Sequence, residues 1–266
     1  MIRVFIAGAT GWAGSALARA VFNHPDMKLV GGLSRTHDGG NLADILGLGD
    51  GHVPMFADID TALSQVEFDV MVEYTAPAVA QKNIMAAVEK GRHVVVGTSG
   101  LSDAAYADIA AAATAHDTGV LAVGNFSMTA VLLQKFAEMA AKYIPDFEII
   151  DYAHESKVDA PSGTVRELAH RLSKVQVPPV HVADDKIIGD TATRGANMGG
   201  VRVHAVRLPG HVISVETIFG LKDERLTLRH DAGSGADPYI RGALLAIENV
   251  AGVKGLRRGL DSVMTF

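Results

Sequence analysis

Cysteine is absent from this chain of 266 residues, which excludes disulfides, thiolate metal sites and a cysteine nucleophile. No run of about 18 apolar residues is present, so no membrane-spanning helix is expected. The amino-terminal residues also lack the apolar core of a signal peptide. The 11 histidines show no metal-binding spacing such as H-E-x-x-H, and no metal site is predicted.

Positive charge is not in excess either, since 24 basic residues stand against 30 acidic ones. A nucleic-acid-binding surface is therefore not expected, although a local basic pocket for a small anion is compatible with this balance. The hydrophobic share of 48% and the charged share of 20% are those of a folded globular protein. The length predicts one large domain or two modest ones. A cytoplasmic protein without membrane or nucleic-acid partners is the expectation.

Short apolar runs alternate with helical patterns over the first half of the chain. The expected strands are 3–7, 28–33, 68–74, 93–96 and 120–123, and the expected helices are 12–22, 79–89 and 102–115. Because parallel strands need crossover helices, this alternation predicts a Rossmann-type α/β fold with a doubly wound parallel sheet.

The pattern changes after Asn125. Helices are expected at 129–143, 163–172 and 238–250, and strands at 147–150, 201–208, 211–219 and 225–230. The last three strands alternate polar and apolar residues, which predicts a second α+β domain with a mixed, mostly antiparallel sheet. The segment 176–200 is rich in proline and glycine and is expected to be a long loop, of the kind that forms lids or oligomer contacts.

The first strand leads directly into Gly8-Ala-Thr-Gly11-Trp-Ala-Gly14, and a helix follows at once. Glycines at this spacing let the backbone approach a pyrophosphate, and the helix amino terminus offers it N–H groups. This context predicts a dinucleotide site. A tight glycine turn without a ligand is the alternative.

The second strand ends in Ser34, Arg35 and Thr36, where an NAD-selective site would carry an acidic residue. Arg35 suits a 2′-phosphate, so NADPH is predicted, with NADH as a second cofactor. An ordinary surface arginine is the alternative. Two later strand ends, 73–77 and 97–100, are expected to line the same cofactor cleft because ligands bind at the carboxyl ends of such strands.

The segment 154–164 reads His154-Glu-Ser-Lys157-Val-Asp159-Ala-Pro-Ser-Gly163-Thr164 and leads into a helix. Gly163 and Thr164 can offer backbone N–H groups to an anion, and His154 and Lys157 can bind it or donate a proton. An anion pocket and a plain capped helix start preceded by a charged loop both fit these residues.

The string K-V-D-A-P-S-G-T at 157–164, after a dinucleotide unit that opens at Gly8, resembles the 4-hydroxy-tetrahydrodipicolinate reductase family, formerly called dihydrodipicolinate reductase. Further similar segments are 97–100, 125–127, 216–219 and 224–230. The resemblance extends in order over nearly the whole chain. It implies an NAD(P)-binding domain at 1–126 and 233–266, and a substrate-binding and oligomerisation domain at 127–232.

The resemblance also implies a cytoplasmic homotetramer of lysine and diaminopimelate biosynthesis that reduces a cyclic dicarboxylate, 4-hydroxy-tetrahydrodipicolinate, to tetrahydrodipicolinate. Lys157 and His154 take the catalytic positions, and both also bind substrate together with Gly163 and Thr164. The implied cofactor-binding residues are Gly8, Gly11, Trp12, Ala13, Arg35, Tyr74, Thr75, Gly97, Thr98 and Ser99, with Asn125, Phe126 and Met128 at the hinge between the domains.

Three departures from the family pattern are visible. Ala153 stands where the family has the first of two adjacent histidines, the proposed acid, and only the second is retained as His154. The segment 233–237 lacks an expected arginine, and Thr10 replaces a frequent glycine. Two alternatives therefore stay open: a diverged imine or carbonyl reductase with another anionic substrate, and a non-catalytic dinucleotide-binding paralogue.

Overall fold

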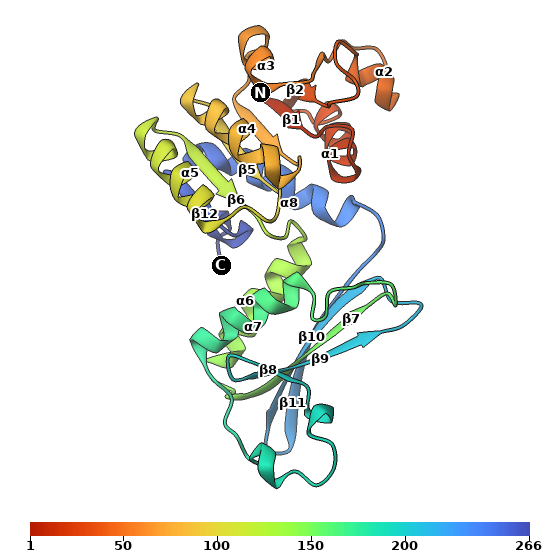
Figure 1. The fold of residues 1–266 in the computed structure, drawn as a ribbon, viewed down its shortest axis with the longest axis vertical. Coiled ribbons are helices and arrows are strands. Elements are labelled where there is room, and N and C mark those ends of the chain that lie inside the picture. Colours follow the sequence, from red (N-terminus) through yellow and green to blue (C-terminus); the bar gives the residue numbers. More distant parts are fainter. The chain divides into compact units, whose positions relative to one another are not determined.

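The structure is a computed structural model that describes all residues from Met1 to Phe266. It divides into two compact units, one formed by Met1–Met128 with Ala236–Phe266 and the other by Thr129–Gly235 (Figure 1). Compared with the boundaries expected from the sequence, residues 127–128 join the first unit and residues 233–235 join the second. No helix combines the length and apolarity needed to cross a membrane.

The first unit is built on a seven-stranded sheet in the order β12-β6-β5-β4-β1-β2-β3, and every pairing in it is parallel. The strands are β1 (Ile2–Ala7), β2 (Met27–Leu33), β3 (Met55–Phe56), β4 (Val70–Glu73), β5 (His93–Val96), β6 (Gly119–Ala122) and β12 (Gly255–Arg258). The helices are α1 (Trp12–Phe22), α2 (Leu42–Leu46), α3 (Ile59–Gln65), α4 (Pro77–Glu89), α5 (Asp103–Ala115) and α8 (Asp237–Asn249).

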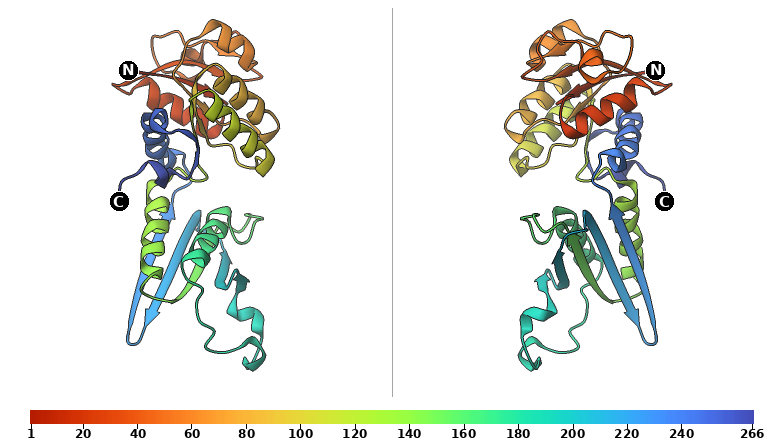
Figure 2. Two further views of the ribbon diagram at one scale, coloured as in Figure 1. Left: turned by 90° about the vertical axis from the view of Figure 1, so that its left-hand side faces the viewer. Right: turned by 90° about the vertical axis from the view of Figure 1, so that its right-hand side faces the viewer.

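Helices lie on both faces of this sheet (Figure 2), as a doubly wound fold requires. One face carries α3, α4 and α5, whose buried side chains share a core with Phe5, Phe68 and Met71. Helices α1 and α8 pack against each other. The Rossmann-type sheet predicted from the sequence is confirmed.

Local sequence explains several boundaries of these elements. The side chain of Ser102 accepts a hydrogen bond from the Ala105 N–H and caps α5, as expected. Gly91, just beyond α4, has a φ of +71°, a value at which a side chain would be strained. The elements α2, α3, β3 and β12 were not expected. Strand β12 has the sequence G-L-R-R and is identified only by its pairing with β6.

The second unit contains a five-stranded sheet in the order β11-β10-β7-β9-β8. Its strands are β7 (Asp146–Ala153), β8 (Ala196–Met198), β9 (Val201–Arg207), β10 (Ile213–Leu221) and β11 (Glu224–Ala232). Only β7 and β9 are parallel, so the predicted mixed, mostly antiparallel sheet is confirmed. Helices α6 (Met128–Ala141) and α7 (Gly163–Val175) share a core with the alternate, inward-facing residues of β7 and β10.

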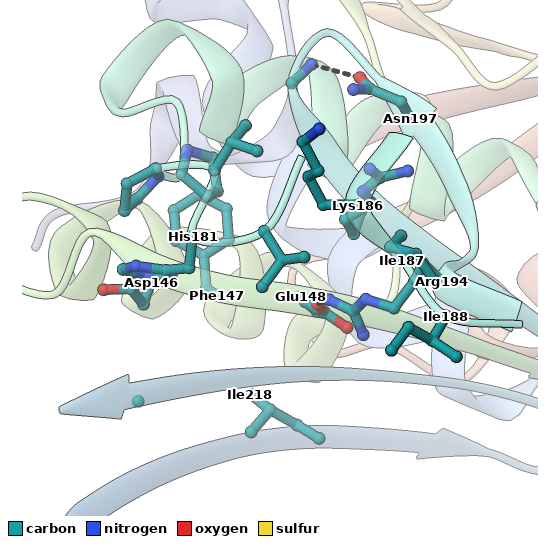
Figure 3. A pocket seen from close by; sticks show the side chains of 17 residues that line it. Asp146, Phe147, Glu148, His181, Lys186, Ile187, Ile188, Arg194, Asn197 and Ile218 are labelled. Carbon is teal, nitrogen blue, oxygen red and sulfur yellow. Dashed lines mark hydrogen bonds and ion pairs between the residues drawn. The ribbon is translucent and has the colours of Figure 1, made fainter. Parts of the chain in front are cut away.

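The segment 176–200, expected to be a loop, contains two short 3₁₀ helices, Asp184–Lys186 and Thr191–Arg194, besides β8. A cavity of about 760 Å³ lies between this segment and the sheet (Figure 3). Its charged groups are paired internally. The pairs are Arg194 with Glu148, His181 with Asp146, Arg202 with Asp184 and Lys186 with Asp185. One of these ion pairs lies within the segment 176–200, and the other three connect the segment to β7 and β9.

Candidate functional site

The loop between β1 and α1 has a shape that only glycine permits. Gly8 has a φ of +85°, and a Cβ there would lie 2.8 Å from the carbonyl oxygen of Tyr74. A Cβ on Gly14 would lie 2.1 Å from the carbonyl oxygen of Gly8. Helix α1 begins at Trp12 after Gly11, and no side chain caps it. The result is a side-chain-free cradle at a helix amino terminus, which fits a dinucleotide pyrophosphate.

Hydroxyl groups and one imidazole gather beside this cradle at the end of β2. The hydroxyls of Thr10 and Ser34 are 3.1 Å apart. The Nδ1 of His37 lies 3.1 Å from the Ser34 Oγ and 2.9 Å from the Thr36 Oγ1. Arg35 is exposed and makes no ion pair within the chain. Thr10 and His37, which the sequence reading did not select, therefore adjoin the residues expected to bind the adenosine phosphate.

The loops after β4, β5 and β6 meet at the same edge of the sheet. The Tyr74 ring packs edge-on against Phe126, with 5.8 Å between ring centroids. A Cβ on Gly97 would lie 2.1 Å from the Tyr74 ring, so this glycine is sterically required. The Thr98 hydroxyl donates to the Thr75 carbonyl oxygen at 2.9 Å. Burial raises the pKa of the Tyr74 phenol, which keeps it neutral.

The remaining expected cofactor residues belong to the same unit. Ser99 is exposed after β5, Ala13 lies in the first turn of α1, and Met128 begins α6. The Asn125 Oδ1 accepts a hydrogen bond from the Ser127 N–H at 2.9 Å. The structure thus brings the glycine loop and the ends of β4, β5 and β6 to one edge of one sheet.

A buried carboxylate lies beneath these loops, in the strand end 73–77 that was expected to line the cofactor cleft, although no role was predicted for this residue. Glu73, the last residue of β4, is fully buried. It accepts hydrogen bonds from the N–H and hydroxyl of Thr75 and from the Asn83 side chain. Burial raises the pKa of Glu73, while these hydrogen bonds oppose the shift. The sequence feature that could have identified Glu73 as a functional residue is a glutamate at the end of an otherwise apolar strand.

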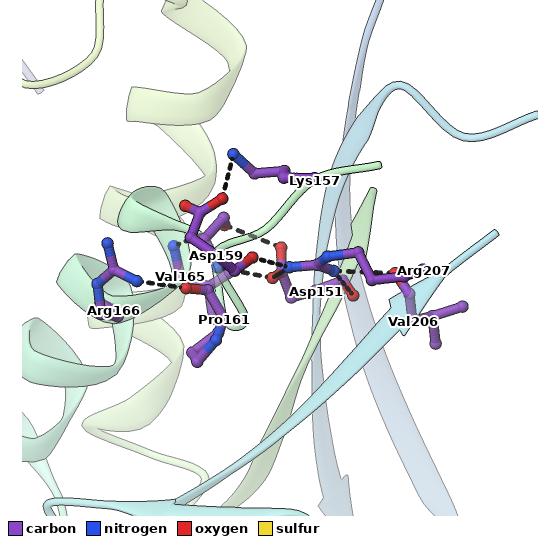
Figure 4. A network of polar contacts seen from close by, with 9 residues as sticks. Asp151, Lys157, Asp159, Pro161, Val165, Arg166, Val206 and Arg207 are labelled. Carbon is purple, nitrogen blue, oxygen red and sulfur yellow. Dashed lines mark hydrogen bonds and ion pairs between the residues drawn. The ribbon is translucent and has the colours of Figure 1, made fainter. Parts of the chain in front are cut away.

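In the second unit, the start of α7 is held by a polar network (Figure 4). Ser162 caps the helix by accepting a hydrogen bond from the Val165 N–H at 3.4 Å. The fully buried Asp151 carboxylate accepts from the Ser162 N–H at 2.7 Å and from its hydroxyl at 2.8 Å. Arg207 donates to Asp151 at 2.7 Å and to the Asp159 carbonyl oxygen at 2.6 Å. The network fixes the loop that precedes Gly163 and Thr164.

Lys157 lies in that loop and pairs with Asp159, with 2.7 Å between Nζ and Oδ1. The lysine hydrogen bond lowers the pKa of the Asp159 carboxyl. His154 is half exposed, and its ring contacts Glu155 at 3.0 Å and the Ser156 hydroxyl at 2.9 Å. The backbone N–H of Lys157 donates to the His154 carbonyl oxygen, so one tight turn carries both expected catalytic residues.

Ala153 is fully buried at the end of β7, with no ionisable group. No group of three or more histidine, aspartate or glutamate side chains is arranged to hold a metal ion. The turn from His154 to Asp159 holds titratable side chains that precede α7, and the buried pair of Asp151 and Arg207 lies beside the start of that helix.

The fold and the glycine cradle define the class of this protein: a two-unit protein with a Rossmann-type unit suited to a dinucleotide and an α+β unit. An amine dehydrogenase from Mycobacterium smegmatis shares the fold, with a TM-score of 0.66 at 14% identity. The family follows from comparison with protein-family models. The model for the dihydrodipicolinate reductase N-terminus matches residues 2–126, and that for its C-terminus matches residues 129–264. The chain belongs to the dihydrodipicolinate reductase family.

Individual relatives are similar to this chain over nearly their full length. The 4-hydroxy-tetrahydrodipicolinate reductase of Bacillus mycoides is 34% identical over 263 residues, which cover 99% of this chain and 98% of the relative. That of Bacillus cytotoxicus is 35% identical over 268 residues, with the same coverage. The dipicolinate-bound dihydrodipicolinate reductase of Paenisporosarcina sp. TG-14 has a TM-score of 0.89 at 30% identity, covering 99% of this chain and all of that one.

Proposed function

We propose that this chain catalyses the NAD(P)H-dependent reduction of 4-hydroxy-tetrahydrodipicolinate to tetrahydrodipicolinate, with NADPH preferred. The observation that carries the activity is the full-length family relationship, in which both family halves occur in order in one chain. The reaction belongs to lysine and diaminopimelate biosynthesis. The dipicolinate bound to the Paenisporosarcina reductase supports a small dicarboxylate as the substrate.

The protein residues have separate tasks in this proposal. When bound, the nicotinamide supplies the hydride, and the protein supplies orientation and charge stabilisation. The first turn of α7, at Gly163 and Thr164, binds a substrate carboxylate through backbone N–H groups. Lys157 stabilises charge near the substrate nitrogen or donates the proton that nitrogen takes up. His154 binds a carboxylate and contributes less to proton transfer.

Steady-state oxidation of NADPH with enzymatically generated 4-hydroxy-tetrahydrodipicolinate tests the activity. Turnover that depends on both reactants is the expected result. Binding of NADPH without turnover would contradict the proposed activity and leave two explanations, a diverged reductase and a non-catalytic paralogue. We also propose that the active form is a homotetramer, which light scattering on the purified protein checks.

A diverged reductase with another anionic substrate is the second candidate, and Ala153 is the observation that favours it. A fully buried alanine provides no acid where the family pattern has one. Turnover of other cyclic imine or carbonyl acids, at rates above that with 4-hydroxy-tetrahydrodipicolinate, would support this candidate over the first.

Arg35 is proposed to bind the 2′-phosphate of NADPH. We expect Arg35→Ala to weaken NADPH binding by about 1–3 kcal/mol, because one charge-assisted contact is lost. NADH lacks that phosphate, so its affinity should change little. Titration calorimetry with both cofactors makes the comparison, and an equal loss for NADPH and NADH would remove Arg35 from this role.

Thr164 is proposed to bind a substrate carboxylate at the start of α7. We expect Thr164→Val to raise the Michaelis constant for the substrate severalfold, since a hydroxyl is lost from the anion site while the backbone N–H remains. The affinity for NADPH should stay unchanged. A lower melting temperature without any kinetic change would indicate that Thr164 serves only the helix start.

A further inference from the structure

The Glu73 side chain is a buried carboxyl group without a cationic partner. Its residue is 0% exposed, and no lysine, arginine or histidine lies in ion-pair contact with it. A carboxylate in such a place costs free energy unless hydrogen bonds replace the lost water. The three residues before Glu73 in β4 are all apolar, so the packing of the strand does not explain a glutamate at this position.

The groups that hydrogen bond to Glu73 come from three separate segments. Thr75 donates its N–H at 2.6 Å and its hydroxyl to one carboxylate oxygen, and Asn83 in α4 donates at 3.0 Å to the other. The Thr98 hydroxyl lies 3.4 Å from the same oxygen that Thr75 contacts. The Thr75 N–H and the Asn83 NH₂ group can only donate, which suits a carboxylate acceptor, whereas the single hydroxyl hydrogen of Thr98 is already donated to the Thr75 carbonyl oxygen.

The backbone of Glu73 joins the same loops. Its carbonyl oxygen accepts hydrogen bonds from the N–H groups of Gly97 and Thr98, at 3.0 and 3.1 Å. Side chain and backbone together tie the loop after β4 to the loop after β5. These are the loops that carry Tyr74, Thr75, Thr98 and Ser99, which the family resemblance places on the nicotinamide side of the cofactor.

We propose that Glu73 is a positioning residue that holds the loops after β4 and β5 in the geometry required to bind the nicotinamide end of the dinucleotide. This inference rests on the proposed function. Glu73 acts through Thr75 and Thr98 and not by contact with the reacting atoms. Asn83 donates a hydrogen bond to the second carboxylate oxygen and so belongs to the same hydrogen-bond network.

The test compares two ligands that share the adenosine and pyrophosphate groups. NADPH contains the nicotinamide, whereas 2′-phospho-ADP-ribose lacks it. Glu73→Ala leaves the donors of Thr75 and Asn83 unpaired and releases the two loops, so that NADPH binding has to order them again at a cost of about tenfold in affinity. We expect calorimetry to show that loss for NADPH and less than about a twofold change for 2′-phospho-ADP-ribose.

Glu73→Gln keeps the folded geometry and removes only the charge. Asn83 can turn its amide so that its oxygen faces the new NH₂ group, and the new carbonyl can still accept from Thr75. Hydrogen bonds to a neutral acceptor are about half as strong, so NADPH should bind severalfold more weakly and 2′-phospho-ADP-ribose unchanged. This variant carries the test if Glu73→Ala does not fold.

The melting temperature separates positioning from simple structural support. A raised carboxylate pKa in the folded protein stabilises the fold at low pH, and that stability is lost as pH rises through the folded pKa. At neutral pH, Glu73→Gln should therefore melt at the same or a higher temperature while binding NADPH less tightly. A residue with only a structural role would lose stability on substitution.

Thr118 provides a matched control. It is also buried in the first unit, but it lies at the amino end of β6, on the opposite edge of the sheet. Thr118→Val should alter neither affinity. Equal weakening of NADPH and 2′-phospho-ADP-ribose by the Glu73 variants, or no weakening of either, would overturn the inference. Failure of the unmodified protein to bind NADPH would instead overturn the proposed function.

Discussion

Lys157→Ala is expected to lower turnover by about 10²–10⁴-fold, the usual effect of losing an acid catalyst. A lysine ammonium ordinarily carries its proton at neutral pH, and the turn that holds Lys157 has no second cation of that kind. Ala153 supplies no ionisable group in its place. Steady-state kinetics at saturating NADPH measure the change in kcat.

His154→Ala is the companion variant in this experiment. Its ring is half exposed and contacts Glu155 and Ser156, and we expect its loss to raise the Michaelis constant more than it lowers kcat. If His154→Ala abolishes turnover while Lys157→Ala is near the unmodified enzyme, the two roles are reversed. If neither variant changes the kinetics, the diverged-reductase and paralogue alternatives gain.

Asp151→Ala is expected to lower the free energy of unfolding by about 3–5 kcal/mol, because it leaves the Arg207 charge without its buried partner. The same substitution removes the acceptor for the Ser162 N–H and hydroxyl, so the start of α7 loses its support. The Michaelis constant for the substrate should rise in parallel, whereas NADPH affinity should not change. Urea unfolding, steady-state kinetics and cofactor titration measure these three quantities.

Asp231→Ala is the matched control for that variant. Asp231 also pairs with an arginine of the second unit, Arg229, at 2.9 Å, but its side chain is 58% exposed. Exposed ion pairs contribute little to stability, so a small effect is expected. A loss of stability that is no larger for Asp151→Ala than for Asp231→Ala would show that the buried network does not hold the second unit together.

Much of the candidate cofactor site could be predicted from the sequence because its signals are local. Gly8 and Gly14 lie where other backbone atoms come too close for a Cβ atom, so only glycine fits. The glycine in the sequence therefore indicates such a position directly. Strand and helix periodicity reports which faces are buried, which is why both sheets were predicted. The glycine loop and Arg35 were assigned to the dinucleotide from the residues themselves, whereas the catalytic roles of Lys157 and His154 came from family resemblance, and all these roles stay predictions.

The elements that were missed had weak local signals. Strand β3 has two residues, and β12 has a single apolar side chain among glycine and arginine. Each is a strand only because a neighbouring strand offers it backbone hydrogen bonds. The two 3₁₀ helices of the segment 176–200 likewise show no apolar period that could have predicted them.

The sequence by itself determined the order of the main strands and helices, the glycine cradle after β1 and the capped start of α7, because each depends on residues close together in the chain. Only the tertiary structure decided that Glu73 would meet Thr98 and that Asp151 would meet Arg207, 25 and 56 residues away. Strand order and register bring these groups together, and a charged residue in an apolar strand indicates that a partner is needed without indicating which one.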